Sequence, residues 1–70
     1  MSNAADMTKR QFRAACKRRG FIPRRYFGNF SVPGTNTSVS VWNAGDRRRD
    51  QLAYLIQEQR RLIKDAEETV

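Results

Sequence analysis

Basic side chains dominate the N-terminal part of this chain. Between Met7 and Gly45 there are eight basic residues and no acidic one, whereas six basic and six acidic residues balance each other from Asp46 onward. The net charge of +7 therefore arises in the N-terminal part. Such asymmetry is typical of a surface that meets an anion, most often nucleic acid. The predicted anion-binding or nucleic-acid-binding residues are Lys9, Arg10, Arg13, Lys17, Arg18, Arg24 and Arg25.

Three aromatic residues, Tyr26, Phe27 and Trp42, form a second candidate set because they lie on or near the same predicted ribbon as Arg24 and Arg25. Aromatic rings beside arginines can stack on single-stranded bases. The rings can instead form a dimer contact or a second small apolar cluster. A chain of 70 residues needs most of its rings inside, so structural packing is favoured over base stacking.

Catalytic and metal-binding residue types are scarce. The chain has no histidine, a single cysteine and no glycine-rich phosphate-binding motif. Cys16 lacks a base partner and is interpreted as a small core residue in a reducing compartment. Asp46 and Asp50 flank Arg47–Arg49, which favours ordinary salt bridges. The sequence therefore predicts a protein that is not an enzyme and has no metal or other cofactor.

The first helix is predicted over Lys9–Arg19. Thr8 and Gln11 have the spacing of a capping box, and Gly20 supplies the left-handed residue that ends a helix. Its apolar stripe is narrow, and most other positions are basic. Like charges four residues apart each oppose the helix by a few tenths of a kcal/mol. This local cost is the main reason to infer an anionic partner.

A β-hairpin is predicted within Arg25–Trp42, with Pro33-Gly34 as a type II turn. Period-two alternation places Tyr26, Phe30 and Val32 on one face and Phe27 on the other. After the turn, Val39 and Val41 share a face, opposite Trp42. The two valines and Phe30 are expected to face the helices.

The second helix is predicted from about Arg47 to about Ala66, with Asp46 as the better N-cap and Asn43 as the alternative. Opposite charges with helical spacing, Glu58–Arg61 and Arg61–Asp65, mark its solvated side. Its apolar stripe comprises Leu52, Leu55, Ile56, Gln59, Leu62, Ile63 and Ala66.

The order of elements predicts an α+β fold of the type α-β-β-α, with two helices packed on one antiparallel β-hairpin. Residues 1–7 are expected to form a flexible arm, residues 8–66 a single domain and residues 67–70 a frayed end. Ser2-Asn3-Ala4 resembles a remnant of an expression tag, whereas Met1 before it argues for a natural start. Whether residues 1–6 belong to the natural sequence therefore stays open. Both edges of a lone hairpin are unpaired, which favours a homodimer.

The segments Thr8–Ala15, Gly20-Phe21 and Asn43–Leu55 resemble short proteins encoded by phages and integrated prophages. This group has no assigned activity, so the resemblance implies only a context, namely a small protein acting on host or phage machinery during infection. The chain has no apolar run of membrane-spanning length and no signal-peptide pattern. It is therefore expected to stay in the cytoplasm, that of the host if it is phage-encoded.

Two main hypotheses for function remain. The first is a small basic module associated with nucleic acid through its cationic first helix and through Arg24 and Arg25 at the open end of the hairpin. The second is a phage-type protein-binding module or inhibitor that covers an acidic or functional surface of a host protein. A third possibility is a structural homodimer whose basic face only keeps it soluble.

Overall fold

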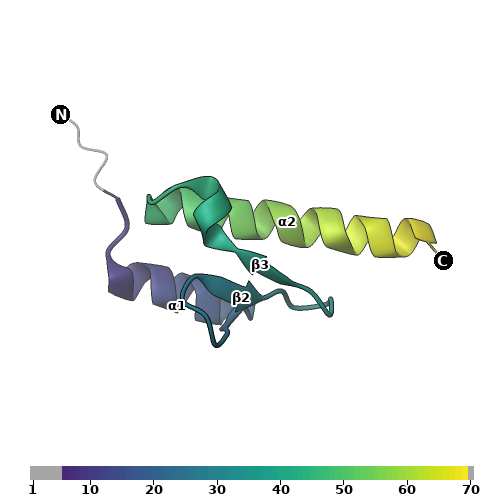
Figure 1. Ribbon diagram of the computed structural model, residues 1–70, viewed down its shortest axis with the longest axis horizontal. Helices are drawn as coiled ribbons and strands as arrows, with labels where there is room; N and C mark the ends of the chain where they lie inside the picture. Colours follow the sequence, from purple (N-terminus) through teal and green to yellow (C-terminus); the bar gives the residue numbers. More distant parts are fainter. Residues whose placement is uncertain (1–5, 70) are drawn as a thin grey trace.

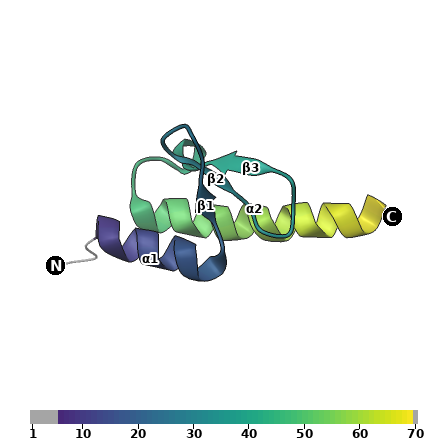
Figure 2. The same cartoon turned by 90° about the horizontal axis from the view of Figure 1, so that it is seen from below.

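The computed structural model describes residues 6–69 of the chain. Two helices, α1 (Lys9–Arg19) and α2 (Arg48–Thr69), lie side by side and run in the same direction (Figure 1). A small sheet packs over them as a second layer (Figure 2). The fold is α+β, as predicted, and α2 is long enough to extend beyond both α1 and the sheet.

Helix α1 has the predicted bounds because both of its ends are encoded locally. The Thr8 side chain accepts a hydrogen bond from the Gln11 amide, and the Gln11 side chain accepts one from the Thr8 amide. At the other end Gly20 is left-handed, with φ of 86°. The Phe21 amide then donates back to the Cys16 carbonyl at 2.9 Å. These contacts satisfy backbone groups that a helix terminus leaves unpaired.

The sheet contains three antiparallel strands in the order β1 (Ile22–Pro23), β2 (Asn29–Ser31) and β3 (Ser38–Ser40). The predicted hairpin corresponds to β2 and β3, with Phe30 opposite Val39. Its turn has Gly34 at φ of 83°, and the Thr35 amide donates to the Val32 carbonyl at 3.2 Å, both of which fit the predicted type II turn. Strand β1 was not predicted, and its first residue, Ile22, takes the extended conformation that is favoured before proline.

The predicted strand region was too long at both ends. Tyr26 and Phe27 lie in the turn between β1 and β2, because Gly28 takes a φ of 90° and the Asn29 amide donates to the Tyr26 carbonyl. Trp42 lies in a short 3₁₀ helix, η1 (Val41–Ala44), which Ser40 caps through its side chain. The alternation predicted that Tyr26 shares the core face of Phe30. This prediction is wrong, because Tyr26 lies in the turn and not in a strand.

The core lies between the helix pair and the sheet. Phe30 packs edge-on against Phe12, with ring centroids 5.8 Å apart. Gln51 is also buried, and its amide nitrogen donates to the Gly45 carbonyl at 2.9 Å. The buried apolar residues are Phe12, Cys16, Phe21, Val32, Val39, Val41 and Leu55.

Helix α2 begins one residue later and ends three residues later than predicted. The Asp6 carboxylate accepts hydrogen bonds from the Arg48 and Arg49 amides at 2.8 and 2.9 Å, in the role predicted for Asp46. Asp6 and Met7 were assigned to a flexible arm, but Asp6 is held by these bonds and Met7 packs on the core. The rest of that arm lies outside the described residues.

The distal half of α2 carries the predicted charge pairs. Arg61 contacts Glu58 at 2.6 Å and Asp65 at 3.5 Å. Glu67 and Glu68, expected in a frayed end, remain helical. Within residues 6–69, neither helix combines the length and apolar character needed to cross a bilayer.

Candidate functional site

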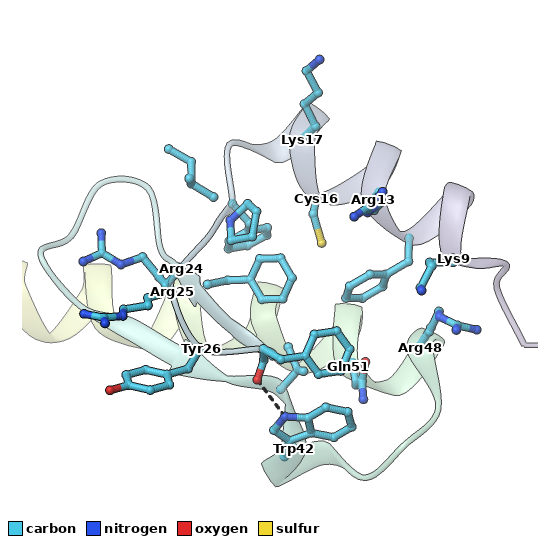
Figure 3. Close-up of a pocket in the computed structure, with 18 of the residues that line it drawn as sticks. Lys9, Arg13, Cys16, Lys17, Arg24, Arg25, Tyr26, Trp42, Arg48 and Gln51 are labelled. Atoms are coloured by element: carbon cyan, nitrogen blue, oxygen red, sulfur yellow. Dashed lines mark hydrogen bonds between the residues drawn. The ribbon is translucent and has the colours of Figure 1, made fainter.

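An open groove of about 810 Å³ lies between α1, the turn from β1 to β2, and η1 (Figure 3). Its inner surface is apolar and is formed largely by core residues, including Phe12, Cys16, Phe21, Phe30 and Val41. Basic side chains surround this surface. We call them the rim cations: Lys9, Arg13, Lys17, Arg24, Arg25 and Arg48.

Helix α1 contributes three of the rim cations because Lys9, Arg13 and Lys17 are spaced four residues apart and share one helical face. The predicted residues Arg10 and Arg18 are not part of the groove. Arg18 instead lines a shallower depression on the other face of α1, together with Arg49. The structure thus brings together five of the seven predicted basic residues and separates two.

The turn that follows β1 contributes Arg24 and Arg25. The Arg24 guanidinium donates to the Ser31 hydroxyl at 3.0 Å, and its amide donates to the Asn29 carbonyl at 2.8 Å. Arg24 is therefore anchored across the β1–β2 pair. Figure 3 shows the side chains of both arginines directed away from the apolar centre of the groove, so their charges stay in solvent.

Arg48 is a rim residue that sequence reasoning did not identify. It lies in the Arg47–Arg49 run, whose spacing does not indicate which arginine reaches the groove. The tertiary fold decides this, because the parallel helices bring the start of α2 next to the start of α1 (Figure 1). The Arg48 guanidinium then donates to the Met7 carbonyl at 3.3 Å. The backbone amides of Arg48 and Arg49 hold the pKa of Asp6 below its usual value.

Tyr26, Phe27 and Trp42, which we call the aromatic patch, border the groove. Their exposed fractions are 70%, 80% and 49%. The Phe27 and Trp42 rings contact each other, with centroids 5.5 Å apart and planes inclined at 46°. Phe27 and Trp42 therefore pack on each other, but most of the surface of Tyr26 and Phe27 remains accessible.

The orientation of the Trp42 indole is fixed by the turn beside it. Its Nε1 donates to the Phe27 carbonyl at 3.1 Å, the bond drawn in Figure 3. The Gly28 carbonyl accepts from the Val41 amide at 2.9 Å. The turn and η1 are thus joined through the main-chain carbonyls of Phe27 and Gly28.

Cys16 projects from α1 toward the apolar centre of the groove. Burial raises the pKa of its thiol to about 11, so the thiol is neutral at physiological pH. A neutral thiol is a poor nucleophile. Cys16 therefore acts here as an apolar wall residue, as the sequence predicted.

The rim cations give the groove a net positive charge. Within the described part of the chain, the five cations of α1 and the turn form no ion pair with a carboxylate. Asp46 is the one acidic residue among those that line the groove. An apolar surface with a cationic margin can bind a ligand that combines flat apolar groups with several negative charges.

Comparison with protein-family models, curated proteins and solved structures finds no match to this chain. The function must therefore be inferred from the groove itself.

Proposed function

We propose that this protein is a small nucleic-acid-binding module that is not an enzyme, and that its contact surface is the groove with its rim cations. One observation carries the proposal. Cations from α1, from the turn and from the start of α2 surround a single groove, although they are as much as 39 residues apart in the sequence.

The clustering of positive charges along α1 lowers the stability of the protein when no ligand is bound. Lys9, Arg13 and Lys17 repel one another along α1, and no carboxylate within residues 6–69 pairs with them. Phosphates placed along the groove would relieve this repulsion. They would also release the counterions condensed on the nucleic acid, which makes binding favourable and dependent on salt.

A gel-shift titration over a range of salt concentrations tests the proposal, with DNA and RNA as separate probes. We expect affinity to fall by decades between low and physiological salt. The variant Arg13→Ala/Lys17→Ala should lower the slope of log affinity against log salt by about 1.4 for single strands and about 1.8 for duplex DNA.

The same helix supplies a matched control. Arg10→Ala/Arg18→Ala also removes two positive charges from α1, but neither residue lines the groove. We expect this variant to retain most of the slope. Equal losses in the two variants would indicate a general charge effect and contradict the groove, and no shift at low salt would contradict nucleic-acid binding.

A protein-binding module is the second candidate, and the exposure of Ile22 and Phe27 favours it, because large apolar patches also mark protein interfaces. Such a module would cover an acidic or functional surface of a host protein. The resemblance to phage-encoded proteins supports a role of this kind in the host cytoplasm. If the gel shifts fail, pull-down from nuclease-treated host lysate tests it.

Self-association is compatible with either function. Strands β1 and β3 each pair only with β2 among the described residues, so each keeps one free edge. Free edges of this kind are often covered in native proteins. We infer a homodimer in solution.

A further inference from the structure

We propose that the groove takes single-stranded nucleic acid and that an unpaired base stacks on the aromatic patch. This inference rests on the proposed function and specifies its substrate class. It starts from the aromatic patch, because the rim cations alone would serve a duplex equally well.

The aromatic patch exposes rings that folding would ordinarily bury. Phe27 is 80% exposed and Tyr26 is 70% exposed, in a chain that has only seven aromatic residues with which to build its core. Exposed apolar area of this kind has an unfavourable free energy in water. A ligand with a flat apolar face would cover it.

The patch is held in place before any ligand arrives. The indole of Trp42 is fixed by the Phe27 carbonyl, and it lies so close to Gly28 that a Cβ atom there would be 2.2 Å from Nε1. The Asn29 amide closes the turn onto the Tyr26 carbonyl at 3.1 Å. The turn is therefore preorganised, which reduces the entropy lost when a ligand stacks on it.

The charges around the patch match a nucleic-acid strand. Arg24 and Arg25 directly precede Tyr26, while Lys9, Arg13 and Lys17 border the groove along α1. A strand whose base contacts the patch can thus place phosphates near cations on two margins of the groove. Aromatic stacking needs access to a base face, and in a duplex those faces are covered by neighbouring base pairs.

Trp42 makes this inference directly measurable, since it is the only tryptophan in the chain. The probes are an oligothymidine of about 12 nucleotides and a blunt duplex of the same length. We expect the oligothymidine to quench Trp42 fluorescence and to bind about 10-fold more tightly than the duplex at equal salt.

Phe27→Ala should weaken oligothymidine binding about 10-fold and leave duplex binding unchanged, whereas Phe27→Tyr should restore the single-strand affinity. Because Phe27 is largely exposed, its loss should not unfold the protein. Circular dichroism of each variant checks this directly.

The outcomes separate the two proposals. Equal binding of both probes, with Trp42 fluorescence unchanged and no effect of Phe27→Ala, would overturn the single-strand inference and leave nucleic-acid binding intact. Absence of binding to either probe at low salt would overturn both. Binding to vesicles of phosphatidylglycerol in place of both probes would likewise overturn both and assign the groove to anionic membranes.

Discussion

Gly28 connects the turn to the aromatic patch through two separate constraints. Its φ of 90° is a conformation that residues with a side chain rarely adopt. Its α-carbon also lies against the indole of Trp42, so that an added Cβ would overlap Nε1, Cε2 and Cδ1. Gly45 shares the first constraint, with the same φ, but has no atom within 4 Å of the added carbon.

This pair of glycines allows a controlled test. Each alanine substitution introduces backbone strain of about 1–3 kcal/mol, but only Gly28→Ala also displaces the indole. We expect Gly28→Ala to unfold at a lower urea concentration than Gly45→Ala and to shift Trp42 emission to longer wavelength in the folded state. Identical unfolding and emission in the two variants would show that the contact does not fix the indole.

At the level of elements, the parallel arrangement of α1 and α2 explains why the start of each helix influences the other. Both N-termini lie at the same end of the molecule (Figure 1), and the positive ends of both helix dipoles meet there. Arg47–Arg49 add further positive charge. Asp6 offsets part of this charge and ties the segment before α1 to the first turn of α2.

Loss of Asp6 should therefore destabilise the protein in a pH-dependent way. Because its pKa is lowered in the folded state, the ionised carboxylate stabilises the fold above the ordinary aspartate pKa, and this contribution disappears as pH falls through the folded-state pKa. We expect Asp6→Ala to have a lower Tm than the parent at pH 7 and an equal Tm in strong acid, measured by circular dichroism.

Asp46→Ala is the matched control, because it removes the carboxylate that the sequence predicted as the N-cap. We expect it to change Tm less than Asp6→Ala at pH 7. A larger effect of Asp46→Ala, or a difference between the parent and Asp6→Ala that persists in acid, would contradict this account of the α2 N-terminus.

The accuracy of prediction from the sequence differed between elements for a physical reason. Helix α1 was predicted to the residue, because its start and end depend on neighbours within a few positions, such as Thr8 with Gln11. The turn at Tyr26 and Phe27 was missed because its pattern alternates like a strand. Its real signal was Gly28, whose positive φ ends the extended chain.

The candidate site was predictable only in part, because some of it depends on contacts between residues that are far apart in the sequence. The basic composition of α1 and Arg24–Arg25 was visible in the sequence, and so was the proximity of the aromatic residues. Arg48 and the separation of Arg18 from the groove were not, because they depend on how α2 packs against α1. The Asp6 contact that fixes the start of α2 spans more than 40 residues.

At the scale of the whole molecule, the cationic groove and the projecting part of α2 are separate features. The groove is lined by α1, the turn from β1 to β2, η1 and the start of α2. The distal half of α2 projects past α1 and the sheet (Figure 2). Leu62 and Ile63 on this half are only partly buried. The projecting half of α2 and the free edges of β1 and β3 are the surfaces through which a second copy could complete the fold.

A measurement of the mass in solution tests the proposed homodimer. We expect light scattering at micromolar concentration to give twice the 8.2 kDa mass of one chain, because a domain of this size buries little surface alone. The fitted mass should decrease on dilution as the dimer dissociates. A constant mass of 8.2 kDa over the whole concentration range would contradict the homodimer.

The central claim is that nucleic acid binds in the groove, and amide chemical-shift mapping during titration with oligothymidine tests it most directly. We expect the largest shifts in the backbone amides of residues 24–28 and in the indole N–H of Trp42, with small shifts at Arg10, Arg18 and the distal half of α2. Shifts that were largest at Arg18 and Arg49, or that were absent from the groove at saturation, would contradict the account.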